Sequence, residues 1–280
     1  MEIYKDIVPM DNTCVAIGYF DGVHAGHMEV LKYLLEKSTQ LAQKPVVISL
    51  RKRGEFYLSS QAEKAFCFER IGLPAMIQIY DDELGTEDAL IRQMGIESVV
   101  TGERCEHRYI TSDAVRHFSI PMVCSEEGEI IRRDILNKEI AEGSFEKFLN
   151  LLGHPYIIMG KVEHGRQLGR TVGMPTANVS VKPMKIQPKD GVYATIVHVS
   201  GKQYFGLTNI GTRPSVDKYG YKTIETNIFD FSEDIYGKEI TLEVTKYVRG
   251  TIKFNNLEEV KEQVDKDKKE IREHFCNMKF

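Results

Sequence analysis

Hydrophobic positions in the first half of the chain alternate between short continuous runs and helical spacing. The runs predict buried strands at Val15–Phe20, Pro45–Leu50, Ala75–Ile79, Ser98–Thr101 and Ile120–Cys124. Between them, apolar residues three and four positions apart predict helices at His27–Leu41, Ala62–Ile71 and Thr86–Met94. Strands and helices alternating at this spacing predict a parallel, doubly wound sheet, whose ligands are expected at the carboxyl ends of its strands.

The pattern changes after two short predicted helices, Asp134–Ala141 and Phe145–Leu152. Segments rich in Val, Ile, Thr and Tyr then predict strands at Val192–Val199, Tyr204–Asn209, Thr223–Phe229 and Ile240–Val248. Glycines separate these segments at turn-like intervals, which favours a small antiparallel β-barrel. We place the domain boundary near Gly153, giving domains at 1–153 and 154–280.

A last helix is predicted from Leu257 to Phe275, with Asn255 or Asn256 as its N-cap. Its apolar stripe is expected to consist of Leu257, Val260, Val264, Ile271 and Phe275. The expected fold is therefore α/β followed by β: a parallel-sheet domain and then a barrel that ends in a helix.

Composition narrows the classes of function. The net charge of −4 argues against a general nucleic-acid footprint, so no nucleic-acid partner is expected. The N-terminus lacks an apolar signal region, and no apolar run reaches membrane-spanning length. Five scattered cysteines without Cys-x-x-Cys spacing favour reduced thiols in the cytoplasm over a zinc site or a disulfide framework. The oligomeric state is left open.

The segment 160–178 carries the densest chemical signal. Four glycines and two arginines precede Pro175-Thr176-Ala177-Asn178. Glycines let a backbone approach a ligand closely, and backbone N–H groups in such a turn can cradle phosphate oxygens. The Thr hydroxyl and the Asn amide add oxygen ligands for a metal ion or contacts for a nucleotide phosphate. The segment is not a Walker A loop, because the chain lacks Gly-x-x-x-x-Gly-Lys-Ser/Thr.

This segment resembles the signature of riboflavin kinases, Gly-Arg-x-x-Gly-x-Pro-Thr-Ala-Asn. Three further stretches match the same family in order and spacing: Gly191-Val192-Tyr193-Ala194, Asn209-Ile210-Gly211-Thr212-Arg213-Pro214-Ser215 and Glu225-Thr226-Asn227-Ile228-Phe229-Asp230-Phe231. Taken singly, a Pro-Thr-Ala-Asn turn or a strand Glu is more often structural. Their joint order, from Tyr156 to the C-terminus, favours function.

The resemblance implies roles for individual residues. Thr176 and Asn178 would hold Mg²⁺ and the phosphates of ATP, and Glu225 would be the general base toward the ribityl hydroxyl of riboflavin. Arg249 would border the isoalloxazine ring of the flavin. The implied nucleotide-binding wall consists of Gly160, His164, Gly165, Gly169, Arg170, Gly173 and Pro175. Outside the resemblance, His164 and His198 lack a partner at metal-ligand spacing, which favours structural roles for both.

The segment 17–27 resembles the Gly-x-Phe-Asp-Gly-Val-His-x-Gly-His motif in the nucleotidylyltransferase half of bacterial bifunctional riboflavin kinases/FAD synthetases. Two histidines beside a helix N-terminus can donate to phosphates and stabilise charge on an α-phosphate. The alternative is that they only cap the helix. The residues that the resemblance assigns to nucleotide binding are Gly18, Phe20, Asp21, Gly22, His24, Gly26 and His27.

Three other segments of the first half depart from that family. Ser49-Leu50-Arg51-Lys52-Arg53-Gly54 replaces an Asp-Pro-His-Pro-like segment, and the segment 102–108 keeps only the first glycine of Gly-x-Asp-Phe-x-Phe-Gly. Arg132-Arg133-Asp134-Ile135-Leu136-Asn137 replaces Ser-Ser-x-x-Ile-Arg. Formation of FAD from FMN is therefore expected to be weak or absent, with Arg132 and Arg133 as substitutes for the lost cationic contact. The alternatives are a regulatory module that senses nucleotide, flavin or RNA, and an adenylyltransferase for another small molecule.

Overall fold

The structure is a computed structural model, and it describes residues 1–103, 108–165, 174–213 and 221–278. The chain divides into two compact units. The first consists of Met1–Leu136 and Leu151–His154, and the second of Asn137–Asn150 and Pro155–Phe280. The boundary at residue 153 stays a prediction. None of the helices in the described ranges has the length and apolarity that crossing a membrane requires.

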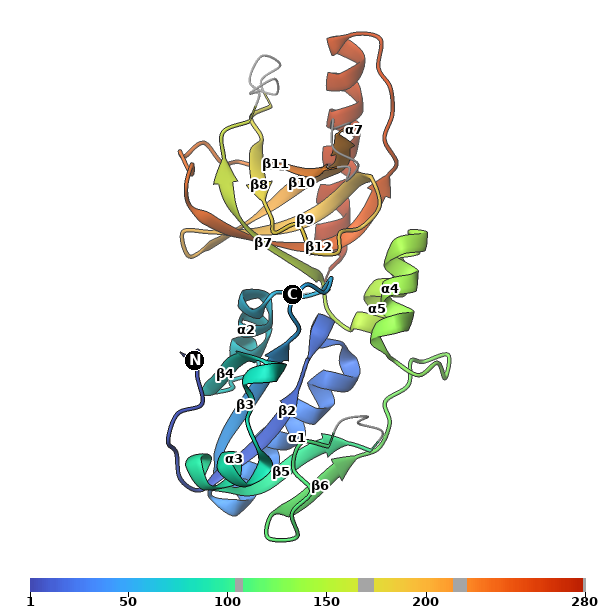
Figure 1. Cartoon of the computed structure of the whole chain (residues 1–280). Coiled ribbons are helices and arrows are strands. Elements are labelled where there is room, and N and C mark those ends of the chain that lie inside the picture. Colours follow the sequence, from blue (N-terminus) through green and yellow to red (C-terminus); the bar gives the residue numbers. More distant parts are fainter. Residues whose placement is uncertain (104–107, 166–173, 214–220, 279–280) are drawn as a thin grey trace. The chain divides into compact units, whose positions relative to one another are not determined.

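The first unit is built on a six-stranded sheet in the order β1-β4-β3-β2-β5-β6 (Figure 1). All neighbouring strands run parallel, as predicted. The strands are β1 (Glu2–Tyr4), β2 (Thr13–Gly18), β3 (Lys44–Arg51), β4 (Ala75–Tyr80), β5 (Ile96–Gly102) and β6 (Arg116–Ile120). The strand predicted at Ile120–Cys124 was wrong, because the paired segment ends where the prediction began. The short β1 was missed, since three residues carry no periodicity.

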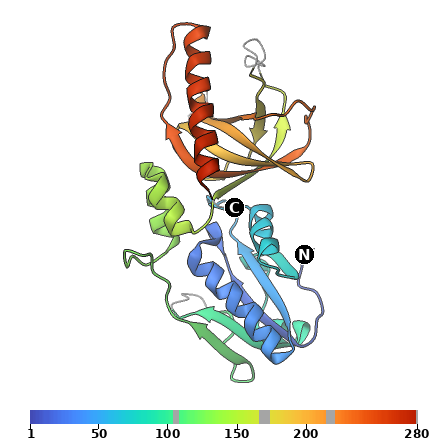
Figure 2. The same ribbon diagram turned by 180° about the vertical axis from the view of Figure 1, so that it is seen from behind.

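Helices lie on both faces of this sheet, as Figures 1 and 2 show from opposite sides. They are α1 (Ala25–Leu41), α2 (Gln61–Arg70) and α3 (Glu87–Met94), with short 3₁₀ turns η1 (Asp21–Val23) and η2 (Asp81–Glu83). Leu90 and Met94 of α3 join the core with β-strand residues such as Val15 and Ile48. Because Gly18 pairs with Ser49, the segments that follow β2 and β3 emerge at the same edge of the sheet.

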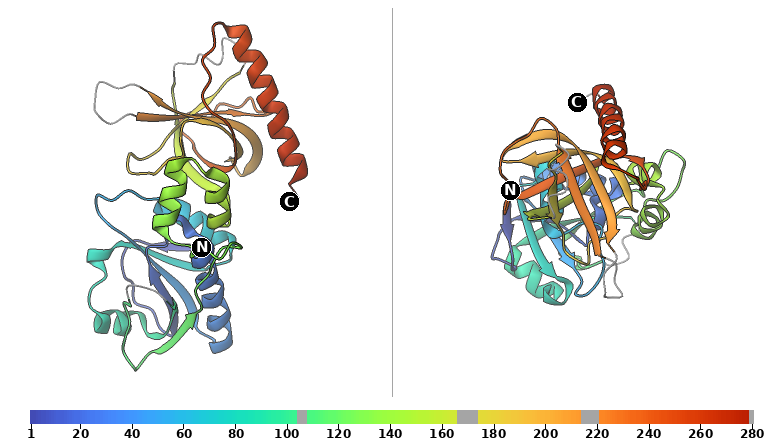
Figure 3. Two further views of the ribbon diagram at one scale, coloured as in Figure 1. Left: turned by 90° about the vertical axis from the view of Figure 1, so that its right-hand side faces the viewer. Right: turned by 90° about the horizontal axis from the view of Figure 1, so that it is seen from above.

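The second unit is a closed antiparallel barrel in the order β10-β11-β8-β7-β12-β9 (Figure 3). Its strands are β7 (Tyr156–Glu163), β8 (Ala177–Ser180), β9 (Gly191–Val199), β10 (Lys202–Arg213), β11 (Tyr221–Ile228) and β12 (Glu239–Arg249). Inward-facing Thr195, Thr208 and Thr226 are fully buried and joined by hydroxyl hydrogen bonds of 2.8 and 3.0 Å. This ladder satisfies polar groups that burial would otherwise penalise.

The helix α7 (Leu257–Asn277) covers the outside of the barrel (Figure 2). Ile271 and Phe275 pack there against Val192, Ala194, Ile196, Leu207 and Phe229. Asn256 caps the helix, as predicted, by accepting from the N–H of Glu259 at 2.9 Å. Leu257 was wrongly assigned to the apolar stripe: it is 63% exposed, because the first turns of α7 extend beyond the barrel (Figure 3).

Two short helices precede the barrel: α4 (Arg133–Glu142) and α5 (Phe145–Leu152). The ring of Phe145 lies 5.1 Å from that of Tyr193, and the ring of Phe148 lies 5.3 Å from that of Tyr156. Both pairs meet edge to face, a favourable arrangement for aromatic rings. Residues of α5 therefore complete the core of the barrel unit.

Candidate functional site

The strand register of the barrel forms a row of polar residues. Glu163 on β7 pairs with Asn178 on β8, Asn178 pairs with Glu225 on β11, and Glu225 pairs with Asn209 on β10. Directly paired residues lie on the same face, with Cβ atoms roughly 4.5–5.5 Å apart. The register thus brings Asn178 and Glu225, which lie far apart in sequence, next to each other.

A cavity of about 110 Å³ lies on these strands. Its lining residues Ala177 and Thr226 are the strand neighbours of Asn178 and Glu225, so they lie on the opposite face of the sheet from the polar row. Thr176 lines it from the turn before β8, and Thr226 lines it from β11. The complete lining is Val162, Pro175, Thr176, Ala177, Thr226, Ile228, Phe231, Ser232, Glu233, Asp234, Ile235 and Tyr236. Sequence reasoning missed the buried Asn227, whose Nδ2 donates to the carbonyl of Pro175 at 2.7 Å. Its place in the Glu225-Thr226-Asn227 match was the available signal, and its role is to hold the turn that carries Thr176.

Glycine is required where β7 and the following loop approach β8. A Cβ at residue 165 would lie 2.1 Å from Nδ2 of Asn178, and one at residue 160 would lie 2.2 Å from the carbonyl oxygen of Ser180. The ring of His164 stacks on that of Tyr236, with centroids 3.8 Å apart. Gly160, His164 and Gly165 of the predicted wall therefore gather around β8 and the turn before it, and Pro175 lies in that turn. The other three wall residues, Gly169, Arg170 and Gly173, lie outside the described residues.

Arg249 ends β12 and is held by α7. Its Nε donates to both carboxylate oxygens of Asp267 at 3.0 Å, and its Nη2 donates to Oδ2 at 2.7 Å. Asp267 is 2% exposed and also accepts from Gln263 at 2.9 Å. Val192 of β9 pairs with Asn209 on one side and with Arg249 on the other. The row of paired polar residues therefore continues through Val192 to Arg249. The guanidinium of Arg249 is fixed by its bidentate pair with Asp267.

The donor set at this site suits magnesium. A hydroxyl on Thr176 and an amide oxygen on Asn178 are hard oxygen ligands, and Mg²⁺ in phosphoryl-transfer sites takes few protein ligands plus substrate phosphates. Across the described ranges, no group of three or more His, Cys, Asp or Glu residues is placed to hold a metal by itself. The residues present therefore fit a magnesium ion that arrives with the nucleotide.

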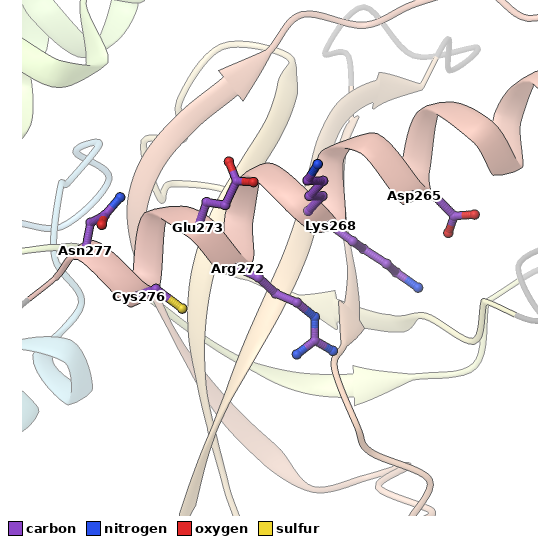
Figure 4. A pocket seen from close by; sticks show the side chains of 7 residues that line it. Asp265, Lys268, Arg272, Glu273, Cys276 and Asn277 are labelled. Atoms are coloured by element: carbon purple, nitrogen blue, oxygen red, sulfur yellow. The ribbon is translucent and has the colours of Figure 1, made fainter.

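A larger hollow of about 460 Å³ lies along α7 (Figure 4). Its lining comes from this one helix: Asp265, Lys268, Lys269, Arg272, Glu273, Cys276 and Asn277. Arg272 is engaged by Asp230 at 3.0 Å. Volume alone would select this hollow, but none of the predicted site residues lines it, so the smaller cavity is the better candidate.

In the first unit, the segment after β2 makes a strained turn. Phe20 and Val23 have φ values of 47° and 48°, and Gly22 has a φ of 81°. His24 is the N-cap of α1, and its Nδ1 accepts from the N–H of His27 at 3.4 Å. The structure therefore contains the contact expected if the histidines only cap the helix, which is the alternative to nucleotide binding. Left-handed backbone at non-glycine residues is costly and is typical of functional turns.

The two imidazoles of this turn are stacked, with ring centroids 3.7 Å apart. Burial lowers the pKa of His24 to about 4, and the neighbouring His154 adds to the shift. Burial also holds the pKa of His27 well below its usual range, with further contributions from His24 and Lys64. Both rings are consequently neutral at pH 7, and each can donate one N–H to a ligand.

Asp21 holds this turn to two other segments. It is 5% exposed, and its Oδ1 accepts from the N–H groups of Leu58 at 2.9 Å and Ser59 at 2.8 Å. Its Oδ2 lies 2.8 Å from Nε of Arg133. Arg132 pairs instead with Asp134. Both arginines expected to replace the lost phosphate contact are thus engaged by carboxylates, which favours structural roles. Gly18 ends β2, and Gly26 lies in the first turn of α1.

Comparison with known families finds one match in each half of the chain. Residues 152–275 match the riboflavin kinase family, and residues 8–80 match the FAD synthetase family.

The chain is similar over 95% of its length to proteins called bifunctional riboflavin kinase/FMN adenylyltransferase. It is 30% identical to the one from Bacillus subtilis (strain 168), covering 93% of that protein. It is also 30% identical to the one from Listeria monocytogenes, covering 94%, and 26% identical to the one from Escherichia coli (strain K12), covering 94%. A crystal structure titled macrolide-efflux protein from Streptococcus pneumoniae has the same fold, with a TM-score of 0.79 and 24% identity over 98% of this chain and 97% of that one.

Proposed function

The chain belongs to the bifunctional riboflavin kinase/FMN adenylyltransferase family, and we propose that its barrel unit transfers the γ-phosphoryl group of ATP to riboflavin. The products are FMN and ADP. The observation that carries this proposal is the pairing of Asn178 with Glu225, with Thr176 two residues before Asn178. It joins the oxygen ligands expected for magnesium to a carboxylate that can take a proton, the two parts that phosphoryl transfer to an alcohol requires.

Glu225 is the proposed general base. As the 5′-hydroxyl oxygen of riboflavin bonds to the γ-phosphorus, the bond to ADP breaks and the hydroxyl proton passes to the Glu225 carboxylate. Glu225 is half-buried on β11, and its strand position is fixed by ladder bonds to β8 and β10. A rigid strand suits this role, because a base must stay within hydrogen-bond reach of the proton it accepts.

Thr176 and Asn178 would hold Mg²⁺ together with the nucleotide phosphates. When bound, the ion neutralises charge on the phosphate oxygens. Gly160, His164 and Gly165 form the described part of the wall on this side. Arg249 would border the flavin ring, and its pair with Asp267 keeps the guanidinium plane in one orientation.

For the first unit we propose adenylyl transfer from ATP to FMN at a lower rate than in the bifunctional relatives. The His24/His27 turn supports nucleotide binding at the N-terminus of α1. Arg132 and Arg133 are poor substitutes for the missing arginine that contacts phosphate in the family, since Asp134 and Asp21 already pair with their guanidinium groups. Misplaced phosphates can cost about 10²-fold in rate. ATP as the shared substrate also favours a cytoplasmic location.

Product analysis tests both activities. The full-length chain is incubated with ATP and Mg²⁺ and with either riboflavin or FMN, and flavins are separated by chromatography. We expect FMN from riboflavin and little FAD from FMN. Absence of FMN would overturn the kinase proposal. Robust FAD synthesis that His27→Ala abolishes would show a fully working first unit, whereas tight nucleotide binding without FAD would favour a regulatory role for it.

A further inference from the structure

Lys64 lies on α2 of the first unit and is only 3% exposed. Its Nζ donates to the carbonyl oxygen of Tyr19 at 2.5 Å, to that of Leu50 at 3.3 Å and to the hydroxyl of Ser49 at 3.4 Å. An ammonium group has three N–H donors, so these contacts use all of them. Tyr19 follows β2, and Ser49 and Leu50 lie at the end of β3. The side chain therefore joins the carboxyl ends of two neighbouring strands.

Burial of this ammonium is costly, and charged groups surround it. The pKa of Lys64 is lowered to about 8, mainly by desolvation. Arg133 and Arg51 contribute to this decrease, while Asp21 and Glu63 act in the opposite direction. A methionine of similar length would avoid the desolvation cost. A lysine whose hydrogen bonds all go to neutral oxygen atoms at strand ends is therefore a candidate for a functional role.

The contact with Tyr19 connects Lys64 to the histidine turn. Tyr19 immediately precedes Phe20, whose left-handed φ of 47° begins the turn that leads to His24. The hydroxyl of Tyr19 also donates to Asp81 at 2.8 Å, so both ends of this residue are fixed. Gln61, on the same helix as Lys64, donates to the carbonyl of Ser49 at 3.0 Å. The first turns of α2 thus determine where the segments after β2 and β3 begin.

We propose that Lys64 is a positioning residue of the nucleotide site in the first unit. Its ammonium fixes the carboxyl ends of β2 and β3, so that the Tyr19–His24 turn is preformed for the triphosphate of an ATP-like nucleotide. Its positive charge beneath the turn adds attraction for that anion. This inference rests on the proposal that the first unit binds ATP, and it assigns to that site a residue outside the 17–27 motif.

Hydrogen exchange measured by mass spectrometry on the full-length chain tests this role. The probe is α,β-methylene ATP with Mg²⁺, titrated while exchange is followed in peptides that cover residues 15–27. These peptides report the first unit alone, independently of nucleotide bound in the barrel and of turnover. In the unaltered chain we expect saturable protection. In Lys64→Met we expect faster exchange without nucleotide and affinity weaker by roughly tenfold to a hundredfold, as for loss of a charged hydrogen-bonding group.

Two further variants separate positioning from packing. Lys64→Arg keeps the charge and the donors, and we expect it to retain most of the protection. Arg70→Met removes an exposed cation from the end of the same helix, and its titration should match that of the unaltered chain. Equal loss in Lys64→Met and Lys64→Arg would indicate a packing role and overturn the inference. Should circular dichroism show Lys64→Met to be unfolded, the folded Lys64→Arg variant decides: retained protection supports the inference, and lost protection overturns it.

The outcomes also distinguish the inference from the function on which it rests. Full protection in Lys64→Met would overturn the role of Lys64 while leaving the nucleotide site in place. No protection in the unaltered chain at saturating nucleotide would overturn the nucleotide site itself, and the inference with it.

Discussion

The pair between Arg249 and Asp267 makes a quantitative prediction for Asp267→Asn. The substitution keeps the shape of the side chain, removes its charge and replaces one acceptor oxygen with a donor. Three hydrogen bonds from Arg249 and one from Gln263 converge on this carboxylate. An amide group cannot accept all of them, and the guanidinium loses its counter-charge.

The magnitude follows from the burial of the two partners. Removing one member of a buried ion pair costs roughly 3–5 kcal/mol. The side chain of Asp267 is 3% exposed, but that of Arg249 is 19% exposed, so water can partly solvate the remaining cation. We therefore expect Asp267→Asn to lower the free energy of unfolding by about 3 kcal/mol, near the lower end of this range. The riboflavin KM should rise as well, because Arg249 is no longer fixed beside the proposed flavin site.

Asp230→Asn is the matched control. Asp230 also pairs with an arginine of α7, Arg272, but these side chains are 76% and 51% exposed. Exposed pairs contribute roughly 0–1 kcal/mol. Urea unfolding followed by circular dichroism measures both variants, using the transition that riboflavin shifts to higher urea, since a ligand stabilises the unit that binds it. Equal losses of unfolding free energy in Asp267→Asn and Asp230→Asn would refute the expected difference between a buried and an exposed ion pair.

Three further predictions concern the sites. Glu225→Gln should lower the turnover of riboflavin phosphorylation by roughly 10²–10⁴-fold with little change in riboflavin affinity; near-full turnover would remove Glu225 from the mechanism. Thr176→Ala should raise the Mg²⁺ or ATP concentration needed for half-maximal rate, and an unchanged metal titration would leave the turn a structural role only. Because the pKa of His24 falls to about 4, the unfolded chain binds more protons there between about pH 4 and 6.5. The stability of the first unit should thus rise with pH across that window, and His24→Gln should flatten the rise in urea titrations.

Much of the fold could be predicted because it depends on local patterns. The parallel sheet, the barrel strands β9 to β12 and the Asn256 cap were indicated by periodicity and by residue type, whereas β7 and β8 were not given bounds. The errors occurred where tertiary context decides. Leu257 has helical spacing, but it lies in the part of α7 that extends beyond the barrel and is exposed. The strand expected at Ile120–Cys124 lies earlier in the chain, at Arg116–Ile120, because pairing with β5 sets its limits.

The candidate site was predictable in its parts and not in its assembly. Pro-Thr-Ala-Asn and Glu225 were each singled out, but their adjacency depends on the pairing of β8 with β11, which no spacing along the chain encodes. Asp267 lies within Asp265-Lys266-Asp267-Lys268-Lys269, a run typical of a solvated helix. Lys64 likewise follows a Glu in a helix with mixed charges. Burial distinguishes Asp267 from Lys266, and it distinguishes Lys64 and Glu63 from the exposed Glu69 and Arg70 on the same helix. Burial is a property of the packed chain.

The division of the chain into units has a consequence for its modularity. Because residues 137–150 group with the barrel while residues 151–154 group with the sheet, the polypeptide passes between the units three times. A single break, whether by a protease or by gene fission, cannot release two complete units. A fragment that starts at residue 154 would lack Phe145 and Phe148 and leave Tyr193 and Tyr156 without their partners. In such a chain the two units would be inherited together, and recombination within 137–154 would damage at least one of them.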